Sequence, residues 1–114
     1  MAKIDFKGVI EAANALRDVK NWLAVLKQEY DVSSEAVKKL NNELDALGTE
    51  LAGITCNTSG LEKQSIRTVA NELRDTKSWL AVFAKEYDLD KEAVKILHKS
   101  LDKFGDKLAA VKCK

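Results

Sequence analysis

The chain contains the same pattern twice, at an offset of 57 residues. When residues 1–57 are laid over residues 58–114, 24 of the 57 positions carry identical amino acids. The densest stretches of identity pair residues 14–25 with 71–82, 29–31 with 86–88 and 35–38 with 92–95, and Cys56 falls on Cys113. A repeat of this kind is one supersecondary unit that stacks on its neighbour to complete a core. The repeat therefore predicts two copies of one folding unit that share a core.

Both copies carry apolar residues at alternating spacings of three and four, the a/d pattern of helices packed lengthwise. In the first copy the pattern runs through Val9, Ala12, Leu16, Val19, Leu23, Leu26 and Tyr30, and resumes through Val37, Leu40, Leu44, Leu47, Leu51 and Ile54. In the second copy it runs through Ile66, Val69, Leu73, Thr76, Leu80, Phe83 and Tyr87, and resumes through Val94, Leu97, Leu101, Phe104, Leu108 and Val111. Each copy is therefore expected to form two helices.

A break in the pattern predicts a short turn between the two helices of each copy. Ser33 and Asp90 are suitable N-caps, and Glu35 and Glu92 fall in the first turn that follows, where the helix dipole favours acidic side chains. A turn of about three residues requires the two helices to run antiparallel.

The clearest linker lies between the copies, over Cys56–Gly60. Ser59 and Glu62 have the spacing of a capping box, which predicts the start of the third helix. One hairpin would leave its apolar stripe uncovered, whereas two hairpins cover each other. We therefore predict an all-α fold: an up-down-up-down antiparallel four-helix bundle of two tandem, internally duplicated helical hairpins, 1–57 and 58–114, within one domain over 1–114. A more open pair of hairpins that dimerises is the alternative.

In hairpin length, turn position and heptad pattern, each copy resembles Rop-type plasmid regulators. In that family two helical hairpins form a bundle that binds RNA. The resemblance implies a bundle of hairpins and is consistent with RNA as a partner, and it assigns no residue of this chain to a site.

The composition is that of a globular helical protein, with no proline and five glycines. No apolar run approaches the ~20 residues of a membrane span, and the N-terminus lacks the apolar region of a secretory signal. Residues 1–57 carry 7 basic and 9 acidic side chains and residues 58–114 carry 12 and 9, so neither half is basic enough to imply nucleic acid from charge alone. We expect a cytoplasmic protein without a membrane partner.

In the cytoplasm Cys56 and Cys113 are expected to be free thiols. Both follow equivalent helices and should lie on the same side of the bundle, so an oxidising setting would allow a disulfide. Asn57-Thr58-Ser59 fits a glycosylation sequon, which has no role without secretion.

Polar residues and tryptophans retained in both copies are the candidates for binding a protein partner. In the first copy they are Asn14, Arg17, Asp18, Lys20 and Trp22, and in the second Asn71, Arg74, Asp75, Lys77 and Trp79. Tryptophan and arginine are enriched at interface hot spots. The structural interpretations are that the tryptophans widen the core stripe and that Arg17 and Asp18 pair with a neighbouring helix.

A basic ridge on the last predicted helix is the candidate for binding nucleic acid. Lysines recur there every fourth residue, at Lys91, Lys95, Lys99, Lys103 and Lys107. Such a ridge could follow phosphates, but Asp102 and Asp106 interrupt it, and a solvated helix face is the simpler interpretation.

No catalytic or metal-binding pattern is present in the sequence. The single histidine has no partner at metal-ligand spacing, and there is no glycine-rich phosphate loop. We predict that the protein is not an enzyme, has no cofactor, and binds another macromolecule, namely a protein or a second copy of itself, as an adaptor, regulator or assembly factor. The alternatives are an RNA- or DNA-binding regulator that uses the lysine ridge, and a purely structural or designed bundle without a ligand.

Overall fold

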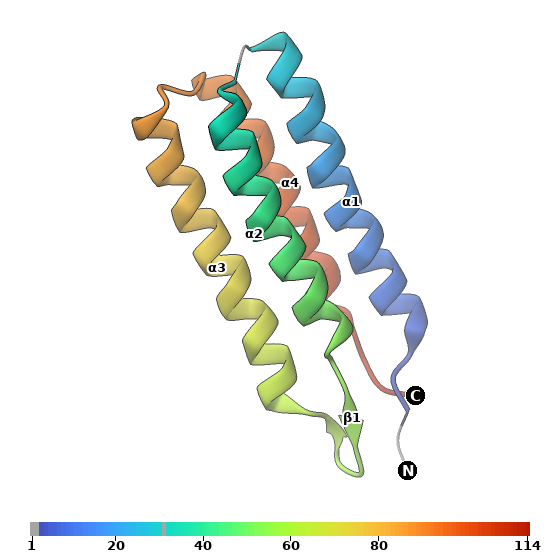
Figure 1. Ribbon diagram of the computed structural model, residues 1–114. Helices are drawn as coiled ribbons and strands as arrows, with labels where there is room; N and C mark the ends of the chain where they lie inside the picture. Colours follow the sequence, from blue (N-terminus) through green and yellow to red (C-terminus); the bar gives the residue numbers. More distant parts are fainter. Residues whose placement is uncertain (1–2, 31) are drawn as a thin grey trace.

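The computed structural model describes residues 3–30 and 32–114 and forms four long helices (Figure 1). They are α1 (Phe6–Glu29), α2 (Ser34–Ala52), α3 (Lys63–Glu86) and α4 (Lys91–Ala109). Two short strands, β1 (Cys56–Asn57) and β2 (Gly60–Leu61), lie between α2 and α3. The bounds of α3 and α4 are those of α1 and α2 shifted by 57 residues, so both copies fold into the same hairpin. The predicted all-α four-helix bundle is confirmed.

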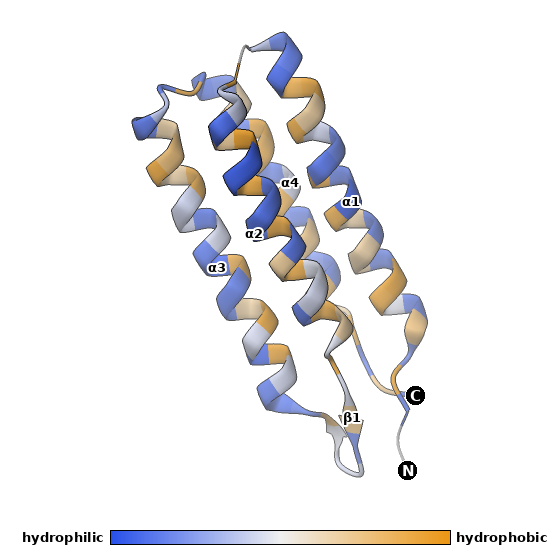
Figure 2. Cartoon of the chain, in the orientation of Figure 1, coloured by the Kyte–Doolittle hydropathy of each residue, from blue (hydrophilic) through white to orange (hydrophobic). Residues whose placement is uncertain are grey.

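The helices form a ring in which each packs on two others. α1 contacts α4 and α2, and α3 contacts α2 and α4, with α1 against α4 the most extensive pair. Apolar and polar segments alternate along each helix (Figure 2), and the buried residues of the four helices are apolar apart from Thr76. The seam residues predicted from the heptads are mostly buried, including Leu23, Leu26 and Phe104 at 1% exposure or less. A void of about 10 Å³ remains between the four helices, which is at the lower limit for holding one water.

The helix starts follow local capping, with two departures from the sequence prediction. The Asp90 carboxylate accepts a hydrogen bond from the Glu92 N–H at 2.8 Å and caps α4 as expected, whereas the Ser33 side chain makes no capping bond to α2. The predicted capping box of Ser59 and Glu62 is wrong. Glu62 is itself the N-cap of α3 and accepts from the Gln64 N–H at 3.0 Å.

The segment between the copies is a small β-hairpin rather than a plain linker. β1 and β2 pair antiparallel, with Cys56 opposite Leu61 and Asn57 opposite Gly60. Gly60 has a φ of +120°, a conformation that side chains with a Cβ rarely adopt. At the tip the Asn57 Oδ1 accepts from both the N–H and the hydroxyl of Ser59, so Ser59 serves the turn instead of the helix.

Both chain ends lie beside this hairpin, at the same end of the bundle (Figure 1). Ile4 and Cys113 form an isolated antiparallel bridge, and the Lys114 N–H donates to the Lys3 carbonyl at 2.7 Å. Gly8 allows the approach of the C-terminal segment, because a Cβ at this position would lie 3.2 Å from the Cα of Val111. Residues 3–5 and 112–114 are therefore held together by backbone contacts.

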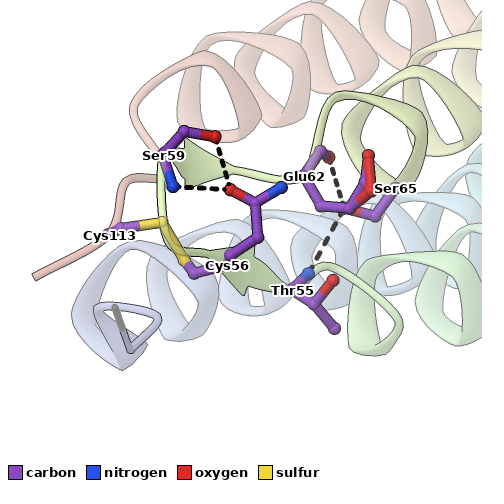
Figure 3. Close-up of a disulfide and its surroundings, with 7 residues drawn as sticks. Thr55, Cys56, Ser59, Glu62, Ser65 and Cys113 are labelled. Atoms are coloured by element: carbon purple, nitrogen blue, oxygen red, sulfur yellow. Dashed lines mark hydrogen bonds between the residues drawn. A yellow bond between two sulfur atoms is a disulfide. The ribbon is translucent and has the colours of Figure 1, made fainter. Parts of the chain in front are cut away.

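A disulfide between Cys56 and Cys113 joins the β-hairpin to the C-terminal segment (Figure 3). The expectation of free thiols is therefore wrong. Their Cα atoms lie 6.1 Å apart, within the ordinary span of a disulfide. The two residues are separated by 57 positions, so each cysteine is bonded to its own counterpart in the repeat.

Candidate protein-binding faces

Two tryptophan–valine pairs project from equivalent places on the bundle. Trp22 and Trp79 are each 45% exposed, and Val25 and Val82, one turn further along α1 and α3, are 42% and 46% exposed. Isolated exposed apolar side chains are common, but large aromatic side chains that are half exposed in a repeated arrangement are not explained by core packing. These two pairs form the centres of the candidate faces.

The first face lies along the contact between α1 and α4. A groove of about 330 Å³ is lined by Asp18 and Trp22 from α1 and by Ile96, Lys99, Ser100 and Lys103 from α4. Trp22 and Ile96 are the apolar residues of this lining, while α4 contributes two lysines and α1 an aspartate. No ion pair to another described residue engages Asp18, Lys99 or Lys103. We call this surface, together with Val25, the α1/α4 face.

The second face is its counterpart between α2 and α3. A groove of about 250 Å³ is lined by Lys39, Asn42 and Glu43 from α2 and by Trp79, Phe83 and Glu86 from α3. We call this surface, together with Val82, the α2/α3 face. At the 57-residue offset, Asn42 and Glu43 of this face stand where the α1/α4 face has Lys99 and Ser100. The α2/α3 face is therefore the more acidic of the two.

Aromatic contacts already occupy part of the α2/α3 face. Trp79 stacks on Phe83 with ring centroids 5.4 Å apart, and Phe83 meets Tyr87 edge-on at 6.2 Å. The Lys39 ammonium lies 5.7 Å from the centroid of Phe83 and 5.5 Å from that of Tyr87. The pKa of Lys39 is raised from its ordinary value, chiefly by the hydrogen bond with the Tyr87 side chain and further by Glu86 and Glu35. Lys39 is therefore held in its charged form over the aromatic rings.

An acidic cluster also adjoins the α2/α3 face. The pKa of Glu72 is raised from its ordinary value, first by burial and then by the hydrogen bond and charge of Glu43, with smaller contributions from Asp75 and Glu50. The first copy has Ala15 in place of Glu72, and this alanine is buried where α1 packs on α4. The two copies therefore differ in charge at this position.

The retained polar residues predicted from the sequence are divided between two flanks of each helix. Lys20 of α1 pairs with Asp45 of α2, and Lys77 of α3 pairs with Asp102 of α4. These lysines join the helices of one hairpin. Asp18, Trp22 and their counterparts Asp75 and Trp79 belong to the opposite flank. The remaining four residues are exposed, at Asn14, Arg17, Asn71 and Arg74.

The lysines of α4 do not form one isolated ridge. Lys91, Lys95, Lys99 and Lys103 are exposed and Lys107 is half-buried. Only Lys99 and Lys103 share the groove with Trp22. Asp102, which interrupts the series, is paired with Lys77.

Several surface residues were not identified from the sequence. Phe6 and Ile10 are 63% and 57% exposed on the first turns of α1. Their counterparts are Lys63 and Arg67, so the repeat comparison gives no signal for them. Asp45 is different, because it recurs as Asp102 and could have been recognised as the partner of a retained lysine.

No protein-family model, curated protein or solved structure matches the chain. Within residues 3–30 and 32–114, no helix combines the length and apolar character needed to cross a membrane.

Proposed function

We propose that the protein is a non-enzymatic helical bundle that binds another protein through its two tryptophan–valine faces. The observation that carries the proposal is the half-exposed Trp22 and Trp79, each beside a half-exposed valine and a groove. Truncation of a tryptophan at the centre of an interface typically costs about 2 kcal/mol or more of binding free energy. Arg17 and Arg74, exposed on the same two helices, are the further candidate contacts.

Nucleic acid is the second candidate partner, and the α1/α4 groove supports it. Trp22 offers a ring on which a base could stack, while Lys99 and Lys103 could contact phosphates. Binding of this kind weakens steeply with salt. A salt-sensitive affinity for single-stranded RNA or DNA that is lost in a Lys99→Gln, Lys103→Gln variant would favour this candidate, and no measurable binding at about 0.15 M salt would exclude it.

The proposed working environment is oxidising. The Cys56–Cys113 disulfide supports this, because such bonds persist in oxidising compartments and are rare in the cytosol. Alkylation of the protein in its native cells, before lysis and without reductant, is expected to leave both cysteines unmodified. Modification of both would return the protein to the cytoplasmic setting expected from the sequence.

A photo-crosslinking amino acid placed at the tryptophans tests the binding function in the native cells. Substitution at Trp22 or at Trp79 should yield adducts of defined mass on irradiation. The matched controls are Asn21 and Ser78, the exposed polar residues that precede the tryptophans. Adducts that are absent at both tryptophans, or equally abundant at the controls, would refute the proposal.

A further inference from the structure

We propose that the α1/α4 face binds the same face of a second copy of this chain, forming a symmetric dimer. This inference deepens the proposed function by naming the partner of one of the two faces. In the symmetric arrangement the two-fold axis runs along the groove. Each α1 then lies over the α4 of the other copy, and residues at equal height face one another.

The charges of the α1/α4 face favour this arrangement because they are complementary to themselves. Asp18 shares the groove with Lys99 and Lys103, so it stands at their height. The two-fold axis places Asp18 of each copy opposite these lysines of the other copy. About two turns further along the helices, Glu11 again places an acid on α1 and Lys107 a base on α4. Glu92 and Asp106 are the acidic exceptions on α4.

The other pairings of faces are less favourable. Two α2/α3 faces would bring Glu43 and its acidic neighbours opposite Asp75 and Glu72, where like charges repel. If the α1/α4 face of one copy packed on the α2/α3 face of another, only one of its two helices would meet residues of opposite charge. That pairing is also heterologous and would not close into a dimer.

The apolar contacts and the available area agree with the charges. Trp22 and Val25 expose 45% and 42% of their surface at the centre of the α1/α4 face, whereas the tryptophan of the other face stacks on Phe83. α1 has 24 residues and is therefore about 36 Å long. With a molecular width of 20 Å, the face offers roughly 700 Å², close to the ~800 Å² per partner of a stable interface.

Sedimentation of the purified full-length chain tests the dimer directly. We expect a concentration-dependent species of twice 12.6 kDa that weakens when salt is raised from about 0.1 M to about 1 M. Trp22→Ala should weaken the dimer at least 100-fold, since a hot-spot residue contributes about tenfold or more and occurs twice in a symmetric interface. Trp79→Ala is the matched control and should leave the dimer unchanged.

A charge exchange tests the position of the axis. Lys99→Glu and Lys103→Glu together place two acids opposite Asp18 and should dissociate the dimer, and adding Asp18→Lys should restore it. Unchanged helical circular dichroism and melting temperature in each variant would exclude misfolding as the cause.

Three outcomes would overturn the inference. The first is a chain that stays monomeric up to about 1 mM, a concentration at which a dimer with ~4 kcal/mol of binding free energy would be half formed. The second is equal weakening of the dimer by Trp22→Ala and Trp79→Ala. The third is a charge exchange that fails to restore the dimer. The cellular crosslinking separates this result from the proposed function. If the purified chain is monomeric while Trp22 or Trp79 yields adducts with other proteins, the dimer is refuted and the binding function stands.

Discussion

Removing the disulfide should destabilise the protein by an amount that follows from its position in the chain. The bond closes a loop between residues 57 positions apart. The chain-entropy relation gives about 14 cal/mol/K for a loop of this length, or about 4 kcal/mol at room temperature. Replacing Cys56 and Cys113 with serine together avoids leaving an unpaired thiol. With an unfolding entropy of ~2.1 cal/mol/K per residue, this loss should lower the Tm by roughly 17 °C.

Urea denaturation followed by the helical circular dichroism signal measures this loss. The oxidised protein is compared with the double serine variant at low protein concentration, and the reduced protein is the control, which should match the variant. The predicted cost arises in the unfolded chain, so the native spectrum should be unchanged. A difference below about 1 kcal/mol would refute the argument, because it would show that the bond does not restrict the unfolded ensemble as its loop length requires.

Four further results are expected from single changes elsewhere in the chain. Leu23→Ala should cost about 2–5 kcal/mol in urea denaturation, because the side chain is only 1% exposed and its removal leaves a cavity. Glu72→Gln should stabilise the protein at neutral pH. The raised pKa means that the native carboxyl binds its proton more tightly than the unfolded one, so wild-type stability falls as pH rises above the ordinary value of 4.5, and the two proteins should converge below it. Gly48→Ala should stabilise by about 0.5–1 kcal/mol, since the added methyl meets a leucine at 3.5 Å, whereas Gly105→Ala should gain less because its contact is 3.2 Å. The isolated fragment 1–57 should be unfolded or dimeric by sedimentation, because the other hairpin covers its apolar stripe, and a stable folded monomer would contradict a shared core.

The helices could be predicted from the sequence because their information is local and periodic. Heptad spacing from Val9 to Tyr30 and from Val37 to Ile54 sets which surface is buried, and a short turn sets the antiparallel order. The β-hairpin between the copies was missed because strands of two residues have no periodicity to detect. Its first strand carries a cysteine whose disulfide partner lies in the C-terminal segment, and the two meet only in the folded bundle.

The candidate faces could be predicted in position but not in extent. Trp22 and Trp79 lie at the edge of the a/d stripe, where a small rotation of the helix decides between burial and exposure. Spacing alone cannot fix that rotation, since it depends on how closely the neighbouring helices pack. The two copies differ beside these residues, since Ala15 is buried in the first copy and Glu72 in the second lies close to Glu43 of α2.

The disulfide has a consequence for how the two copies relate. If a two-fold axis exchanges the two copies, a bond between a residue and its own counterpart must cross that axis. Two separate hairpins with this sequence pattern, associated in the same way, would therefore be linked by the same bond between chains. A cut after Asn57 would turn the protein into that covalent pair, because Cys56 and Cys113 would stay on different pieces and remain joined. The two copies are thus joined covalently at two places, by the disulfide and by the peptide segment between them.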